Sequence, residues 1–299
     1  MPEAFCRVSP DIELCYETFG DPTDPTLLLI MGLATQMIAW PDDFCRELAG
    51  RGFHVVRFDN RDIGRSTHVD APAPTLAQLV TSSRKAASYT LTDMADDAAG
   101  LLRELDLAPA HVVGASMGGM IAQSLAARHP ELVLSLTSIM STTGNRWVGR
   151  PALRLLPMLA ARPARSREAA IERVEKVFKA IGSRGLERDM DHLRDVAGRS
   201  YDRGRGDTRG QARQLAAIRA SGDRTRELRR IKAPTQVIHG TGDPLIRRSG
   251  GRATARAIPG AELLEIEGMG HDLPRAAWPR MIDAIVANAR RADPVPQAA

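Results

Sequence analysis

The sequence predicts an α/β fold, in which a mostly parallel sheet is flanked by helices and a helical segment is inserted between two strands. Short apolar runs that alternate with helical patterns predict the sheet. A stretch without strand patterns, from about residue 142 to residue 230, predicts the insertion. The 299 residues, of which 43% are hydrophobic and 26% charged, fit one large domain or a core with an insertion. This composition excludes collagen, coiled coil and disorder.

Six apolar runs of strand length, each bounded by turn residues, are expected to form the parallel sheet. They are apolar throughout instead of alternating, as a sheet covered by helices on both faces requires. Residues Ile12–Thr18 alternate and predict the start of an antiparallel edge. The six runs are Leu27–Met31, Val55–Asp59, His111–Gly114, Leu134–Met140, Thr235–His239 and Leu263–Ile266.

Helical patterns lie between these runs. Pro41–Gly52 begins with proline and closes with glycine, as helices prefer. Thr92–Leu107 keeps an apolar stripe at helical spacing, and we expect Thr92 to cap it. Trp278–Arg290 is expected to form the final helix.

The insertion is predicted from three further helical patterns, Ile171–Ile181, Leu186–Val196 and Gln211–Ser221. We expect a core of residues 1–143 and 231–292, a helical cap of residues 144–230 and a flexible tail of residues 293–299. A cap at this place in the chain lies over the carboxyl ends of the strands, where ligands bind in open α/β sheets.

The net charge of +5 is distributed unevenly along the chain. Residues 145–230 contain 22 Lys and Arg against 11 Asp and Glu. Only Phe178 and Tyr201 are aromatic between Val148 and Arg230, so platforms for stacking nucleic-acid bases are not indicated. We expect a solvated helical face and no nucleic-acid partner.

Cysteine usage and apolar stretches bear on the compartment. Cys6, Cys15 and Cys45 are an odd number without a C-x-x-C pair, which argues against a disulfide framework and a zinc site. Cys6 and Cys15 can face each other across an opening hairpin, but reduced core thiols are the favoured interpretation. The longest apolar stretch, Leu27–Leu33, is far short of the ~20 residues of a membrane helix, and no signal peptide is visible. A cytoplasmic protein without a membrane span is expected.

The strongest motif is Gly114-Ala115-Ser116-Met117-Gly118, which fits Gly-x-Ser-x-Gly between a strand and an amphipathic helix. A chain that presents a serine at the end of a strand must turn sharply into the helix, which strains the serine backbone. Side chains at Gly114 and Gly118 would collide in such a turn. We expect Ser116 to be a nucleophile, with the N–H of Met117 as an oxyanion donor; a tight turn with a passive serine is the alternative.

A nucleophilic serine needs a base, and the base needs an orienting carboxylate. His271 lies in a Gly-rich loop after the last strand, at the same sheet edge as Ser116, and is the expected base. Asp243 follows the Thr235–His239 strand and gives the chain order Ser, Asp, His, although an Asp-Pro turn would have the same appearance. Asp272 is a poor competitor, because a residue adjacent to His271 cannot easily reach behind its ring. The remaining histidines are interpreted as structural or lack a supporting pattern; they are His54, His68, His111, His129, His192 and His239.

The second oxyanion donor is expected in the turn after Leu27–Met31, where Gly32 lets the backbone turn tightly toward the serine. We assign it to the N–H of Leu33. The run Phe58–Ser66 follows the next strand and carries several charged residues. Binding substrate is one role for these residues, and shaping the loop beside the site is the favoured one.

Residues 27–66 and 110–128, with the Asp243 and His271 loops, resemble the α/β-hydrolase superfamily. They are similar to bacterial carboxylesterases and to the aclacinomycin methylesterase group of polyketide-tailoring enzymes. The resemblance implies an eight-stranded, mostly parallel sheet, and it implies Ser116, His271 and Asp243 as a triad with Leu33 and Met117 as oxyanion donors. Many relatives have histidine before the oxyanion glycine, whereas this chain has Met31.

The expected activity is that of a serine carboxylesterase acting on a small-molecule ester without metal or organic cofactor, as a monomer or homodimer. Short-to-medium acyl esters are the favoured substrates, followed by a methyl ester of a larger aromatic compound. A lactonase, perhydrolase, haloperoxidase or carbon–carbon hydrolase would use the same triad, and a ligand-binding receptor would use the same fold. Serine at position 116 disfavours a dehalogenase or epoxide hydrolase. Apolar residues that either line a pocket or pack on the core are Leu153, Leu155, Leu156, Met158 and Leu159.

Overall fold

The structure is a computed structural model that describes residues 2–75, 78, 87–155, 164, 166–204 and 209–292. Within this described part, eight strands form one sheet in the order β1-β2-β4-β3-β5-β6-β7-β8. Strands β1 and β2, and β2 and β4, pair antiparallel, and all other neighbours are parallel. The strands are β1 (Ala4–Ser9), β2 (Ile12–Phe19), β3 (Thr26–Ile30), β4 (His54–Phe58), β5 (Ala110–Ala115), β6 (Val133–Ile139), β7 (Thr235–Gly240) and β8 (Glu262–Ile266).

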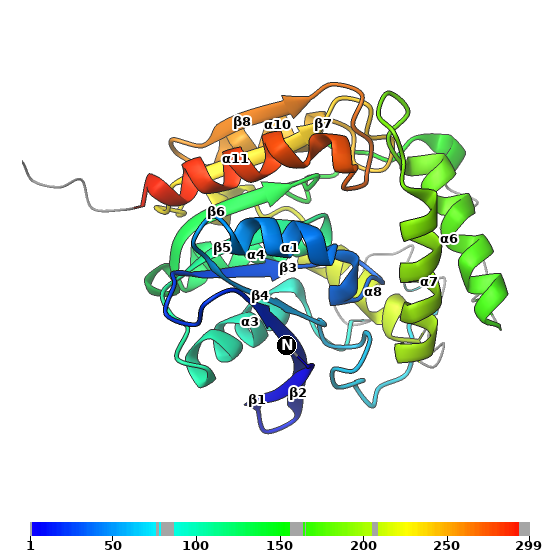
Figure 1. The fold of residues 1–299 in the computed structure, drawn as a ribbon, viewed down its shortest axis with the longest axis horizontal. Helices are drawn as coiled ribbons and strands as arrows, with labels where there is room; N and C mark the ends of the chain where they lie inside the picture. Colours follow the sequence, from blue (N-terminus) through cyan, green and yellow to red (C-terminus); the bar gives the residue numbers. More distant parts are fainter. Residues whose placement is uncertain are drawn as a thin grey trace, which may run out of the picture.

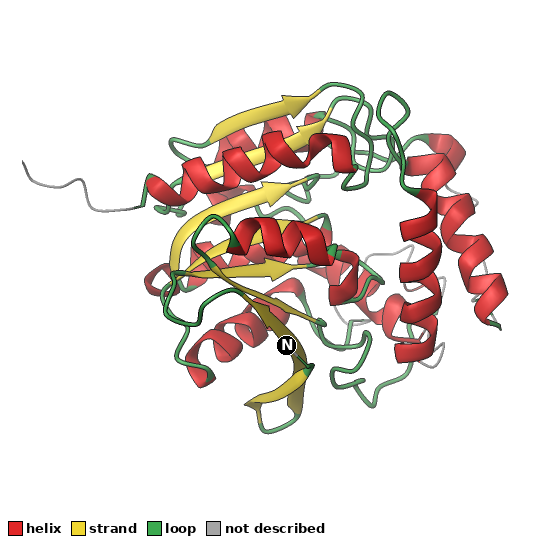
Figure 2. Cartoon of the chain, viewed as in Figure 1, coloured by secondary structure: helices red, strands yellow, loops and turns green. Residues whose placement is uncertain are grey.

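Helices cover both faces of this sheet, as Figures 1 and 2 show. On β3, Leu28 and Ile30 pack into a core with α3 and α4, whereas Leu27 and Leu29 pack into a second core with α1 and α11. Burial on both faces is the reason why the central strands are apolar throughout. The described helices are α1 (Asp42–Ala49), α3 (Leu91–Glu104), α4 (Met117–Arg128), α6 (Arg167–Ile181), α7 (Met190–Gly204), α8 (Arg209–Ser221), α9 (Thr225–Leu228), α10 (Ser249–Ala257) and α11 (Trp278–Arg290).

Most of the predicted strands and helices are confirmed within a few residues, with three corrections. The helix predicted over Leu186–Val196 is α7, which begins at Met190 and continues to Gly204. Helix α3 is capped by Thr90 and not by Thr92, because Thr90 and Asp93 exchange side-chain and backbone hydrogen bonds in a capping box. Strand β8 is not covered on both faces. It lies at the edge of the sheet, and Glu262 and Leu263 are exposed there.

The segment between β6 and β7 carries α6, α7, α8 and α9, and its described residues contain no strand. In Figure 1, α6 and α7 lie at the side toward which the arrowheads of β3, β7 and β8 point. These helices therefore stand at the carboxyl edge of the sheet. The predicted tail, residues 293–299, lies outside the described residues. No helix in the described part of the chain combines the length and apolar character needed to cross a bilayer.

Candidate active site

Ser116 lies in the turn between β5 and α4, and its backbone has φ +56° and ψ −118°. This left-handed conformation is costly for a residue with a side chain. The turn is tight, since a Cβ on Gly114 would lie 2.2 Å from the carbonyl oxygen of Gly118. A Cβ on Gly118 would lie 2.0 Å from the carbonyl oxygen of Ile30. Both glycines are therefore required by the backbone around Ser116.

Ser116, His271 and Asp243 form one hydrogen-bonded chain of side chains. The Ser116 Oγ lies 2.9 Å from Nε2 of His271, and Nδ1 of His271 lies 2.7 Å from Oδ2 of Asp243. His271 follows β8 and Asp243 follows β7, so strand ends far apart in sequence bring the three groups together. With the ring proton on Nδ1, His271 donates to Asp243 and Nε2 accepts from the Ser116 hydroxyl.

The Asp243 carboxylate is oriented by backbone groups of its own loop. Its Oδ1 accepts hydrogen bonds from the N–H groups of Leu245 and Ile246, at 2.8 and 2.9 Å, which leaves Oδ2 for His271. Asp272 points to a different partner, as expected from its place next to His271. Its carboxylate accepts from the N–H of Ser183 at 3.0 Å and from the Ser183 hydroxyl at 2.6 Å. Burial raises the pKa of Asp272, and the hydrogen bonds from Ser183 oppose this rise.

Leu33 and Met117 lie on two backbone segments that meet beside Ser116. A Cβ on Gly32 would lie 3.1 Å from the Ser116 Cβ, so the turn after β3 passes close to the serine. The N–H of Met117 belongs to the first turn of α4, where helices leave N–H groups without intrahelical partners. Within the described residues, no backbone hydrogen bond engages the N–H of Leu33 or Met117.

The turn after β3 is held by a residue that the sequence did not single out. Gln214, on α8 and fully buried, accepts a hydrogen bond from the N–H of Ala34 at 2.9 Å and donates to the carbonyl of Arg61 at 2.8 Å. Ala34 itself has a positive φ of 58°. A single glutamine 180 residues away carries no local signal, so only the folded chain identifies it.

The charged residues after β4 bind to the protein itself. The buried Asp59 accepts from the N–H of Met37 and from Arg203, at 2.7 and 2.9 Å. Asp62, also buried, pairs with Arg213 of α8 through two hydrogen bonds of 2.6 and 2.8 Å. These contacts agree with the favoured interpretation, in which the charges shape the loop beside the site.

The other residues singled out from the sequence are not part of the hydrogen-bonded chain from Ser116 to Asp243, or they lie outside the described part. His239 is buried, and its Nε2 lies 2.7 Å from the carbonyl oxygen of Ile246. Burial lowers its pKa, so the native structure favours a neutral ring. Leu155 packs with Ala152 and Ile181 in a small apolar cluster, whereas Leu153 is 81% exposed, so neither provides evidence for a pocket. Leu156, Met158 and Leu159 lie outside the described residues.

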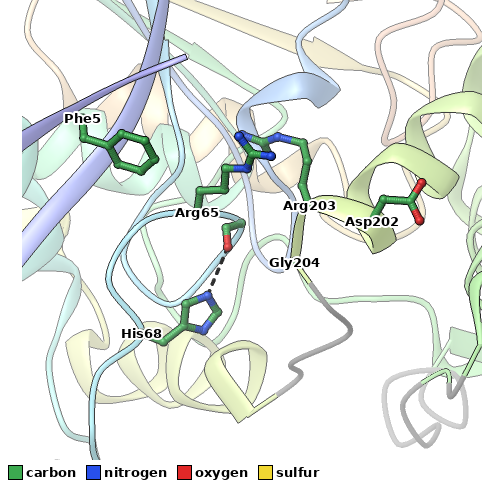
Figure 3. A pocket seen from close by; sticks show the side chains of 7 residues that line it. Phe5, Arg65, His68, Asp202, Arg203 and Gly204 are labelled. Atoms are coloured by element: carbon green, nitrogen blue, oxygen red, sulfur yellow. Dashed lines mark hydrogen bonds between the residues drawn. The ribbon is translucent and has the colours of Figure 1, made fainter. Parts of the chain in front are cut away.

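A surface cavity of about 600 Å³ lies between the end of α7 and the loop after β4 (Figure 3). The figure shows the His68 ring bound to the carbonyl of Gly64, at 3.2 Å. The cavity contains none of the residues around Ser116, and Arg203 on its wall is engaged by Asp59. Its lining residues are Phe5, Gly64, Arg65, His68, Asp202, Arg203 and Gly204. No group of three or more potential metal ligands among His, Cys, Asp and Glu occurs in the described ranges.

Comparison with known proteins shows which family this chain resembles. The sequence model of the alpha/beta hydrolase fold family matches residues 25–274. Rhodomycin D methylesterase DauP of Streptomyces sp. (strain C5) is 31% identical to this chain, over 94% of this chain and 96% of that protein. Pimeloyl-[acyl-carrier protein] methyl ester esterase of Chromobacterium violaceum is 31% identical over 59% of this chain and 68% of that protein. The enol-lactonase of Burkholderia xenovorans LB400 has a similar fold, with a TM-score of 0.68 at 24% identity, over 97% of this chain and 99% of that one.

Proposed function

The chain belongs to the alpha/beta hydrolase fold family, and from this premise we propose that it hydrolyses carboxylic esters through an acyl-enzyme on Ser116. The observation that carries the proposal is the continuous hydrogen-bonded chain from Ser116 through His271 to Asp243. A serine, an imidazole and a carboxylate in this order are the groups that acyl transfer needs.

The reaction follows from these groups. Ser116 Oγ attacks the ester carbonyl carbon while Nε2 of His271 takes the hydroxyl proton, and Asp243 stabilises the imidazolium that forms. The N–H groups of Leu33 and Met117 bind the oxyanion of the tetrahedral intermediate. When the intermediate collapses, the alcohol leaves with the proton from His271. Water then gives its proton to His271 and attacks the acyl carbon, which releases the acid and restores Ser116.

A methyl ester of a larger acid, such as an aromatic polyketide, is the substrate class that we propose. The support is a relative named for rhodomycin D methylesterase activity that matches nearly the whole chain, together with a second relative named for methyl ester hydrolysis. This order reverses the preference for short-to-medium acyl esters that the sequence favoured. We further propose that residues 144–230 act as a cap over a core of residues 1–143 and 231–292. The position of α6 and α7 at the carboxyl edge of the sheet supports this division (Figure 1).

The test compares hydrolysis of an aromatic polyketide methyl ester with hydrolysis of nitrophenyl esters of increasing acyl length and of lactones. Ser116→Ala is expected to lower kcat by about 10⁴-fold or more. A fluorophosphonate is expected to label the wild-type protein at Ser116. Ser124→Ala is the matched control, since Ser124 is a buried serine within α4, the helix that Ser116 precedes, and this variant should retain wild-type activity.

Two outcomes would contradict the proposal. Undiminished turnover by the Ser116→Ala protein would exclude the covalent route. A wild-type protein that binds the esters but neither hydrolyses them nor reacts with the fluorophosphonate would indicate a ligand-binding receptor. A preference for short acyl esters or lactones over the methyl ester would leave the triad in place and refute the substrate class.

A further inference from the structure

The loop that carries His271 is bound on both sides of the histidine by the last residue of α6 and the residues that follow it. The N–H of His271 donates to the carbonyl of Ile181 at 2.8 Å. The N–H of Gly270 donates to the hydroxyl oxygen of Ser183 at 2.9 Å. On the other side, the carboxylate of Asp272 accepts from both the N–H and the hydroxyl of Ser183. Ser183 therefore bridges the residues before and after His271.

The two segments are also in direct backbone contact. A Cβ on Gly270 would lie 2.4 Å from the carbonyl carbon of Gly182, which is closer than side chains tolerate. A Cβ on Gly268 would lie 3.1 Å from the Cα of Gly185. With no side chain between the two backbones, a displacement of one segment is transmitted to the other.

We propose that Ser183 and Asp272 are positioning residues, whose hydrogen bonds join the C-terminal end of α6 to the His271 loop and hold the imidazole within reach of Ser116. This inference rests on the proposed function, in which His271 is the base. Ser183 has a fully buried side chain, and its hydroxyl donates to Asp272 while accepting from Gly270. The segment between β6 and β7 thereby contributes to the geometry of the reacting groups and not only to the covering of the site.

Asp272 can influence His271 in two ways, and substitutions distinguish them. Its negative charge can act on the neighbouring imidazole, or its carboxylate oxygen can hold the His271 loop in place through the hydrogen bonds from Ser183. Asp272→Asn removes the charge and the acceptor at Oδ2, which lies 3.0 Å from the backbone nitrogen of Ser183. It keeps an oxygen where Oδ1 accepts from the N–H and the hydroxyl of Ser183. Asp272→Ala removes the charge and the hydrogen bonds. Comparison of the two variants separates position from charge.

The experiment measures kcat, KM and the pH dependence of kcat for Asp272→Asn, Asp272→Ala and Ser183→Ala. Matched controls are Asp223→Asn and Thr225→Ala, because Asp223 accepts from the N–H and hydroxyl of Thr225 at 2.9 and 2.5 Å in the same chemical arrangement. Asp272→Ala and Ser183→Ala are expected to lower kcat about 10–100-fold with little change in KM. Asp272→Asn and both controls should stay within about 3-fold of the wild type.

Wild-type kcat in Asp272→Ala would overturn the proposal. Equal losses of kcat in Asp272→Asn and Asp272→Ala, with a shift of the acid limb of the pH profile of kcat, would also overturn it. Such a result would mean that Asp272 acts on His271 through its charge. If Asp272→Ala fails to fold, Ser183→Ala decides, since it removes one hydroxyl only.

A second readout does not depend on turnover. The low-field proton resonance of the His271 Nδ1–H bound to Asp243 is recorded in the Ser116→Ala background. It should broaden or move when Asp272→Ala is added, and an unchanged resonance would contradict the positioning role. Failure of the proposed function would instead show as undiminished turnover by the Ser116→Ala protein itself.

Discussion

Gly118→Ala tests the steric account of the turn at Ser116. The added Cβ would lie 2.0 Å from the carbonyl oxygen of Ile30 and 2.7 Å from that of Met31. Contacts below 3.0 Å essentially never occur, so α4 and β3 must separate by about 1 Å. Neither obstacle is a side chain that can rotate away, because both are backbone atoms of the segment that leads into the turn at Gly32. A misplacement of about 1 Å in the reacting geometry costs on the order of 10²-fold in rate.

The assay measures kcat on an activated ester and the thermal midpoint of the same preparation. Overpacking of about 1–3 kcal/mol corresponds to a fall of about 2–5 °C for a chain of this length. Gly50→Ala is the control, since Gly50 ends α1 with a helical φ of −64° and a Cβ there meets nothing closer than 3.4 Å. A Gly118→Ala protein with wild-type kcat and wild-type thermal midpoint would refute the argument.

Three further predictions concern stability, pH and thiol chemistry. Arg213→Met leaves Asp62 buried without its cation. Calorimetry should therefore record a loss of about 3–5 kcal/mol in the free energy of unfolding, or a thermal midpoint lower by about 5–8 °C. A change of the midpoint below about 1 °C would exclude a stabilising ion pair. Because burial lowers the pKa of His239, the unfolded chain takes up its proton first as pH falls, and stability to urea should decrease below about pH 6.5. His239→Gln should reduce this dependence, and an identical pH slope in both proteins would contradict the assignment. Burial raises the pKa of both Cys15 and Cys45 to about 12. Ellman's reagent at pH 8 should therefore modify these two thiols only after denaturation. Rapid modification of the two thiols in the native protein would refute their burial.

The sequence was sufficient for features that depend on the local backbone. The Gly-x-Ser-x-Gly pattern predicted a strained serine at a strand-to-helix turn, and Ser116 has a positive φ of 56°. The position of the helix cap was also available locally, since Thr90 and Asp93 form a capping-box pair three residues apart. The prediction chose Thr92 because periodicity locates a helix but leaves its first residue uncertain by about one or two positions.

Contacts between distant segments required the folded chain. Ser183 and Asp272 are 89 residues apart, and Gln214 meets Ala34 across 180 residues, so no spacing rule identifies either pair. The position of β8 at the edge of the sheet also could not be predicted from the sequence, because the order of strands in a sheet depends on how the strands assemble.

The amino-acid order alone thus determined which residues turn, which strands are apolar and where a serine, an aspartate and a histidine follow strand ends. Distances between those side chains, and the partners that orient them, were decided only by tertiary packing. The physical reason is that backbone strain and periodicity act over a few residues, whereas a hydrogen bond depends on the separation in space of two groups whose separation in sequence carries no information.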